Sequence, residues 1–213
     1  MRSLPILMSG LLLGLFGVLG AGLVGMSHEA TAERITRNER EALLHQLHVL
    51  VPEDQIDNDI LSDVIRISDP ELLGTESTLV YRGRRADQAI AAVYSPVVTQ
   101  GYSGSIQLII AVRVDGTLAG VRVLSHRETP GLGDKVEVER SPWVLDFDGK
   151  SLLNPVTNEW KVRRDGGVFD QFTGATITPR AVVRGVHATL LHFAKHKPRL
   201  FEIGTPPAEK HDG

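Results

Sequence analysis

The chain of 213 residues contains no cysteine. Without thiols it can form no disulfide, no thiolate metal site, no iron-sulfur cluster on its own ligands and no cysteine nucleophile. Aromatic residues are also few, at 5% of the chain. If this protein carries electrons, something other than sulfur or sulfur-bound iron must hold them, and a bound organic cofactor is the natural candidate.

Neither sign of charge dominates the sequence. The 23 Lys and Arg residues face 26 Asp and Glu residues, which leaves a net charge of -3. Binding to a phosphate backbone draws on a surplus of basic side chains, so nucleic-acid binding is disfavoured. Apolar residues make up 42% of the chain, which is typical of folded proteins and predicts one globular domain with an appendage.

A long uncharged run does stand at the start of the chain. The segment SLPILMSGLLLGLFGVLGAGLVGMS, residues 3–27, carries no charge between Arg2 and His28. About 20 apolar residues span a bilayer, so residues 1–27 are predicted to form a transmembrane anchor. The alternative is a cleaved signal peptide ending near the ATA of residues 30–32, but the run exceeds the roughly 7 to 15 residues of a signal core.

The charges that flank this anchor predict its orientation. Arg2 and the N-terminal amine favour the cytoplasmic side, and a single span then places residues 28–213 on the outer side. In a bacterium the expected location is the inner membrane, with the C-terminal domain in the periplasm.

Beyond the anchor the hydrophobic period changes from helical to alternating. Residues 28–76 are predicted to form a helical lead-in, with an amphipathic helix that stops at Pro52. From residue 77, alternating segments and an Asp-Gly turn predict an antiparallel meander of four strands. The segments WVLDFDGKSL and EWKVRRDGGVFD are expected to add short strands.

A final helix over residues 179–197 has an apolar face with which to cover the sheet. The predicted fold class is therefore α+β, an antiparallel sheet with flanking helices, preceded by one N-terminal transmembrane helix. Residues 77–205 are expected to form the main domain, and residues 206–213 a disordered tail.

Three threonines lie within six positions in the segment FDQFTGATITPRAVVRGV, residues 169–186. Thr178 is predicted to be a helix N-cap, because Pro179 then occupies the first helical position. The preceding TGAT would lie where backbone amides and the helix dipole favour a phosphate. From spacing alone, Thr173 and Thr176 are either turn residues or part of such a phosphate site.

The segment DQFTGAT, residues 170–176, resembles the flavinylation motif of a family of FMN-binding domains. These domains are found in the G subunit of the Rnf (Rsx) electron-transport complex and in the C subunit of the sodium-pumping NADH:quinone reductase. The resemblance implies that FMN is joined to Thr176 by a phosphoester bond. It also implies that Asp170 and Thr173 are recognised by a flavin transferase, with Gly174 and Ala175 between the two threonines. The residues 77–205 would then be an FMN-binding domain.

A second segment, ETPGLG at residues 128–133, resembles the loop beside the flavin in these domains. Pro130 and the glycines predict a tight turn whose backbone can lie flat against a planar ring. The residues expected to bind cofactor from this loop are Glu128, Thr129, Gly131 and Leu132. Without the resemblance, a purely structural turn is an equal interpretation.

The resemblance implies an electron-carrying subunit of a membrane-bound complex that couples electron transfer to ion translocation. Its partners would be the other Rnf subunits, and no side chain would act as an acid-base catalyst. The alternative is a membrane-anchored, non-redox module that binds a phosphate ligand. His192 and His196 are interpreted as an exposed helical pair rather than a metal site, because no third ligand is evident.

Overall fold

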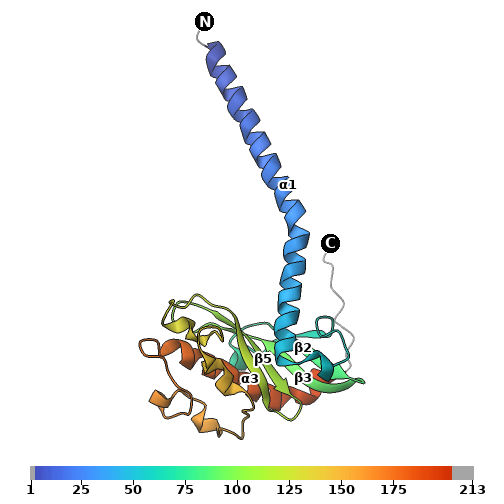
Figure 1. The fold of residues 1–213 in the computed structure, drawn as a ribbon, viewed down its shortest axis with the longest axis vertical. Coiled ribbons are helices and arrows are strands. Elements are labelled where there is room, and N and C mark those ends of the chain that lie inside the picture. The colour runs from blue at the N-terminus through green and yellow to red at the C-terminus, as the bar shows by residue number, and fades with distance from the viewer. Residues whose placement is uncertain (1–2, 203–213) are drawn as a thin grey trace. The chain divides into compact units, whose positions relative to one another are not determined.

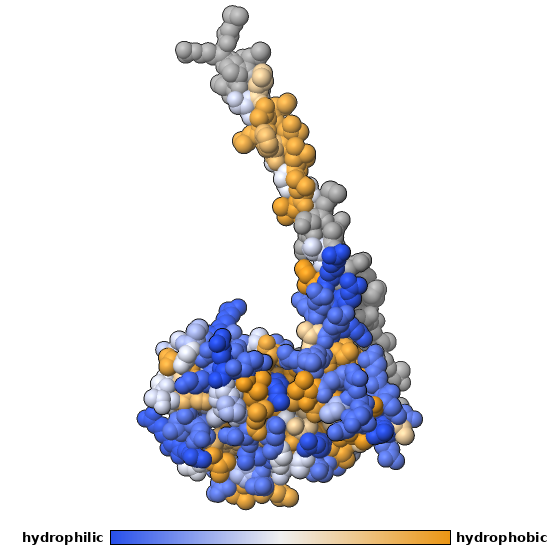
Figure 2. Space-filling model, in the orientation of Figure 1, coloured by the Kyte–Doolittle hydropathy of each residue, from blue (hydrophilic) through white to orange (hydrophobic). Residues whose placement is uncertain are grey.

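The computed structural model describes residues 3–202 (Figure 1). Its contacts divide the chain into two units between His45 and Gln46, and the helix α1, Ser3–Leu50, runs through this division. Within α1, the segment Met8–Gly25 is long and apolar enough to cross a membrane. Its apolar side chains are exposed (Figure 2). The expected tail over residues 206–213 lies outside the described residues.

The predicted lead-in is only partly helical. α1 ends at Leu50, close to the predicted stop at Pro52, but the following residues form other elements. These are the 3-10 turn η1 (Glu53–Gln55), the strand β1 (Val64–Ile67) and the short helix α2 (Pro70–Leu73). The prediction missed β1 because its four side chains alternate only between exposed and half-buried, which is a weak hydrophobic signal.

The predicted antiparallel meander is confirmed and extended to six strands. The other five are β2 (Thr78–Arg85), β3 (Gln88–Ser95), β4 (Val97–Val98), β5 (Ile106–Arg113) and β6 (Leu118–Ser125). β1, β2, β3, β5 and β6 lie side by side in that order. Pro96 separates β3 from β4, and both pair with the same edge of β5. Pro96 has no N–H to donate, which explains the interruption.

Both faces of the sheet are covered. The long helix α3 (Ile177–Phe201) lies against one face, where its apolar side chains join those of the strands in the core (Figure 1). The end of α1 lies against the other face. A Cβ atom on Gly120 would come within 2.7 Å of Leu50 Cδ2, so the end of α1 packs closely on this strand position.

The short strands predicted between residues 143 and 170 do not form. This region contains the 3-10 turns η3 (Pro142–Phe147), η4 (Thr157–Glu159) and η5 (Arg163–Asp165), with isolated bridges between them. Both tryptophans of the chain and three phenylalanines pack into one cluster here, with Phe147 and Phe169 stacked at 4.6 Å. Aromatic packing, rather than a strand ladder, therefore holds this segment against the core.

Candidate functional site

A cavity of about 520 Å³ opens at the N-terminal end of α3. Four separate segments contribute to its wall: the loop before β5, the loop after β6, the turn η5 and the residues that lead into α3. The lining residues are Tyr102, Glu128, Thr129, Leu132, Gly133, Arg164, Gly174, Ala175, Thr176, Ile177 and Thr178. A cavity of this size is in the range that holds a cofactor.

The fold therefore brings the two sequence motifs together. Of the residues predicted to bind cofactor, six line the cavity: Glu128, Thr129, Leu132, Gly174, Ala175 and Thr176. Asp170, Thr173 and Gly131 are outside this lining. Thr173 is exposed, and the Asp170 carboxylate pairs with Arg163 Nη1 at 3.0 Å. The Asp170 backbone is held in place because its carbonyl accepts a hydrogen bond from Trp143 Nε1 at 2.8 Å.

The predicted start of the last helix is wrong by two residues. α3 begins at Ile177, and Thr176, not Thr178, occupies the N-cap position. Pro179 is the third helical residue. Amides in the first turn have no intrahelical acceptor, so a proline at this position breaks no helix hydrogen bond. The Thr176 side chain accepts no hydrogen bond from the helix amides. Its hydroxyl is therefore not used as a cap.

Thr178 has a different role from the one predicted. It is fully buried, and its hydroxyl donates a short hydrogen bond to Glu128 Oε2. Glu128 Oε1 accepts a second bond from the Ser103 amide at 3.0 Å. One carboxylate thus joins the loop after β6, the loop before β5 and the first turn of α3, which are the walls of the cavity.

The backbone around Glu128 is fixed from both sides. The Glu128 amide donates to His126 Nδ1 at 2.9 Å, so His126 Nε2 carries the proton that bridges to Glu137 Oε1 at 2.7 Å. On the other side, a Cβ atom on Gly133 would lie 2.8 Å from Glu128 Cβ and 2.9 Å from Thr178 Oγ1. Only a glycine allows this approach.

The predicted tight turn in ETPGLG is confirmed. The amides of Leu132 and Gly133 both donate to the Thr129 carbonyl, at 3.1 and 3.0 Å. The turn leaves Leu132 41% exposed, and Tyr102 from the loop before β5 is 68% exposed. Both side chains line the cavity, so it has apolar surfaces that a planar ring can contact.

A cation also lines the cavity. Arg164 belongs to η5, which is tied to α3 because Asp165 accepts two hydrogen bonds from Arg180, at 2.6 and 2.8 Å. These bonds lower the pKa of Asp165, so the carboxylate stays ionised. Asp165 is thus engaged by Arg180, and the positive charge of Arg164 remains at the cavity wall.

Sequence reasoning did not predict five of the lining residues: Tyr102, Gly133, Arg164, Ile177 and Thr178, the last of which it assigned only as a helix cap. Tyr102 and Arg164 are distant in sequence from both motifs, and no local pattern marks them. Gly133 was within the ETPGLG segment, and Ile177 immediately follows TGAT. Those two could have been found from their position alone.

The histidine pair on α3 also differs from the prediction. His192 is only 4% exposed, so the expected exposed pair is wrong for this residue. Burial, and secondarily the charge of His196, lower the pKa of His192. The two rings stack with centroids 4.5 Å apart, and Asp69 lies close to both.

Two stretches of the chain match known families. Residues 101–191 match the FMN-binding domain, and residues 1–50 match the RnfG N-terminal region. The first match includes all four segments that line the cavity. The chain is therefore an FMN-binding-domain protein with an apolar N-terminal helix.

Related proteins are similar in sequence to nearly the whole chain. The G subunit of the ion-translocating oxidoreductase complex of Pseudomonas aeruginosa (strain UCBPP-PA14) is 47% identical over 195 residues, which cover 91% of each chain. The same subunit of Shewanella oneidensis is 40% identical over 98% of this chain and 99% of its own. That of Cereibacter sphaeroides (strain ATCC 17023) is 45% identical over 93% of this chain and 89% of its own. This chain belongs to the family formed by the G subunits of ion-translocating oxidoreductase complexes.

Proposed function

We propose that this chain carries FMN covalently on Thr176 and relays electrons within its complex. One observation carries the proposal: Thr176 lines the cavity at the start of α3, and no helix amide engages its side chain. A phosphoester needs a threonine oxygen that is accessible and not committed to the fold. Thr178 is buried and bonded to Glu128, and Thr173 is outside the cavity lining, so neither neighbour meets both conditions.

The surroundings of Thr176 suit a phosphate. The amides of Ile177 and Thr178 belong to the first turn of a 25-residue helix, where amides have no intrahelical acceptor. The positive end of the helix dipole lies at the same place. Arg164 adds a full positive charge to the wall. These groups would offset the negative charge of a phosphodiester held at Thr176.

The rest of the cavity suits a planar ring. Leu132 and Tyr102 present apolar and aromatic surfaces, and Leu132 is carried by the hydrogen-bonded turn that begins at Thr129. When bound, FMN supplies the redox chemistry, and the chain supplies orientation and electrostatics. Glu128 would keep the two loops and the helix at a fixed separation, so the ring would meet a preformed surface.

The apolar segment Met8–Gly25 supports a single-pass anchor. Because Arg2 favours the cytoplasmic side, we place the FMN-binding domain on the outer side of a bacterial inner membrane, in the periplasm. The relatives are named as subunits of ion-translocating complexes, so the partners proposed for this chain are the other Rnf subunits. A flavin transferase would be needed for maturation.

The test is in-gel fluorescence. The full chain is co-expressed with a flavin transferase, solubilised in detergent, denatured and run on a gel. We expect a fluorescent band from the wild type, complete loss in Thr176→Val, and retention in Thr157→Val, a matched change at an exposed threonine of η4. Equal melting temperatures of the variants exclude unfolding as the cause of the loss.

Two results would contradict the proposal. Fluorescence that persists in Thr176→Val would remove this attachment site. A wild type without covalent fluorescence, beside a second flavoprotein that the same transferase labels, would favour the alternative of a non-redox module that binds a phosphate ligand reversibly.

A further inference from the structure

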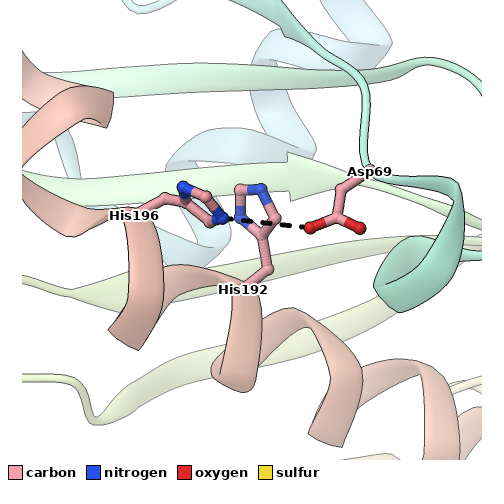
Figure 3. A group of neighbouring side chains, drawn as sticks. All are labelled: Asp69, His192 and His196. Atoms are coloured by element: carbon pink, nitrogen blue, oxygen red, sulfur yellow. Dashed lines mark ion pairs between the residues drawn. The ribbon is translucent and has the colours of Figure 1, made fainter.

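A second cluster of chemically active side chains lies near the other end of α3. His192 and His196 are one helical turn apart, and Asp69 is the N-cap residue of α2 (Figure 3). Each offers one ligand atom, and these atoms all lie within 4.8 Å of one another. In the part of the chain that the structure describes, this is the one group of three or more such side chains that could hold a metal ion.

The His192 ring has a buried hydrogen-bond partner on one of its two nitrogens. Its Nδ1 lies 3.1 Å from the hydroxyl of Tyr94, a fully buried residue of β3. The phenol hydroxyl can donate a hydrogen bond to Nδ1. Nε2 is then the nitrogen left for a metal. A partner on the second ring nitrogen that fixes the imidazole is a recurring feature of metal sites.

Asp69 is also positioned before any metal arrives. Its Oδ1 accepts a hydrogen bond from the Leu72 amide at 3.1 Å and so caps α2. Its Oδ2 lies 3.9 Å from His196 Nε2. The cap holds one oxygen and leaves the other directed to the histidines, so the carboxylate needs little reorganisation to become a ligand.

The cluster opens into a cavity of about 420 Å³, which leaves space for water to complete a coordination shell. Arg66 and Arg199 also line this cavity, and Lys195 lies near His192. Arg66 is partly engaged because it donates to Ser77 Oγ at 3.0 Å. These cations oppose a dication, so binding should be weaker than at a site of the same ligands without them.

We propose that His192 Nε2, His196 Nε2 and Asp69 Oδ2 bind a first-row divalent transition metal of the zinc type. Two imidazoles and one carboxylate, with water in the remaining position, make a four-coordinate set that zinc accepts. The ion would link α2 to α3, two elements far apart in sequence.

No residue lines both this cavity and the cavity at Thr176. His192 is roughly 21 Å along α3 from Thr178 at 1.5 Å per residue. The metal site is therefore separate from the flavin site.

The test is zinc titration of the full chain, solubilised in detergent, purified through a histidine-free tag and stripped with EDTA. We expect one saturable site and a rise in melting temperature, because a ligand that binds only the folded state stabilises it. Cobalt in place of zinc should give the intense visible absorption of a four-coordinate site. His196→Ala should weaken binding by at least about tenfold. His45→Ala, at an exposed histidine of α1, should bind as the wild type does.

A second variant keeps the test independent of folding. Asp69→Ser preserves an N-cap residue for α2 but removes the carboxylate ligand, so it should lose zinc affinity while its metal-free melting temperature stays near that of the wild type. The absence of any saturable zinc site in the wild type would overturn the proposal. So would unchanged affinity in both His196→Ala and Asp69→Ser, because the zinc would then be on other histidines.

Discussion

The two ends of α3 present different kinds of site. At its N-terminal end, the proposed flavin cavity combines helix amides, a cation and apolar surfaces around one uncommitted threonine. Near its C-terminal end, the lining of the other cavity includes two imidazoles and a carboxylate, together with Arg66 and Arg199. We propose that the first end holds an anion covalently and that the second binds a dication that exchanges with solvent. The two proposed sites on this helix thus differ in the charge of the ligand that each would take.

The largest effect on stability is expected from Thr178→Val at the N-terminal end. The change keeps the shape of the side chain but removes the hydroxyl that donates to the buried Glu128 carboxylate. We expect a loss of about 1.5 to 3 kcal/mol in the free energy of unfolding, the usual range for a hydrogen bond to a charged group.

Denaturation of the detergent-solubilised chain measures this loss, with Thr178→Ser as the control that keeps the hydroxyl. Zinc binding at the other end should be unchanged in both variants. A Thr178→Val chain as stable as the Thr178→Ser chain would show that the contact with Glu128 does not hold the two motifs together.

The two ends also differ in how far sequence alone could define them. The N-terminal site rests on two short continuous motifs, residues 128–133 and 170–176, so its core was predictable. The helix start was assigned two residues late because Thr178-Pro179 fits an N-cap pattern, whereas Thr178 is buried and donates a hydrogen bond to Glu128. That hydrogen bond joins segments that are distant in sequence, so no local pattern indicates it.

The C-terminal site was not predictable for the same reason. His192 and His196 have helical ligand spacing, but Asp69 reaches them only because α2 packs on α3.

The prediction of strands between residues 143 and 170 was wrong for a different reason. Their Asp-Gly turns do form, with positive φ at Gly149 and Gly166, but the flanking aromatic side chains pack inward instead of pairing in a ladder.

An intermediate effect is expected at the C-terminal end from Asp69→Ala. This change removes the cap on the Leu72 amide and should cost about 1 kcal/mol in the absence of metal. Asp69→Ser should recover most of that loss, which a denaturation series in EDTA can measure. Equal losses in the two variants would indicate that the carboxylate charge, and not the cap, matters at this residue.

The smallest effect is a dependence of stability on pH at the same end. The pKa of folded His192 is lowered, chiefly by burial, so the unfolded chain takes up a proton more readily than the folded chain. The folded chain therefore keeps its full stability above the pKa of about 6.5 that a histidine has in the unfolded chain. Stability is lost as the pH falls through that value towards the lower pKa of folded His192. We expect metal-free melting temperatures to fall between about pH 7 and pH 5.

His192→Gln should reduce this slope. His187, whose pKa is also lowered by burial, should preserve a residual dependence in the variant. Melting curves in EDTA across this range measure both slopes. An identical slope in the wild type and in His192→Gln would assign the pH response to other groups.

The most direct test of the proposed function is peptide mass spectrometry on the full chain after co-expression with a flavin transferase. Trypsin releases residues 165–180, a peptide that contains Thr173, Thr176 and Thr178 together. We predict that fragmentation places the mass of one FMN, less one water, on Thr176 alone. The same mass on Thr173 or Thr178, or an unmodified peptide from a chain that retains its flavin, would contradict the assignment of Thr176 as the point of attachment.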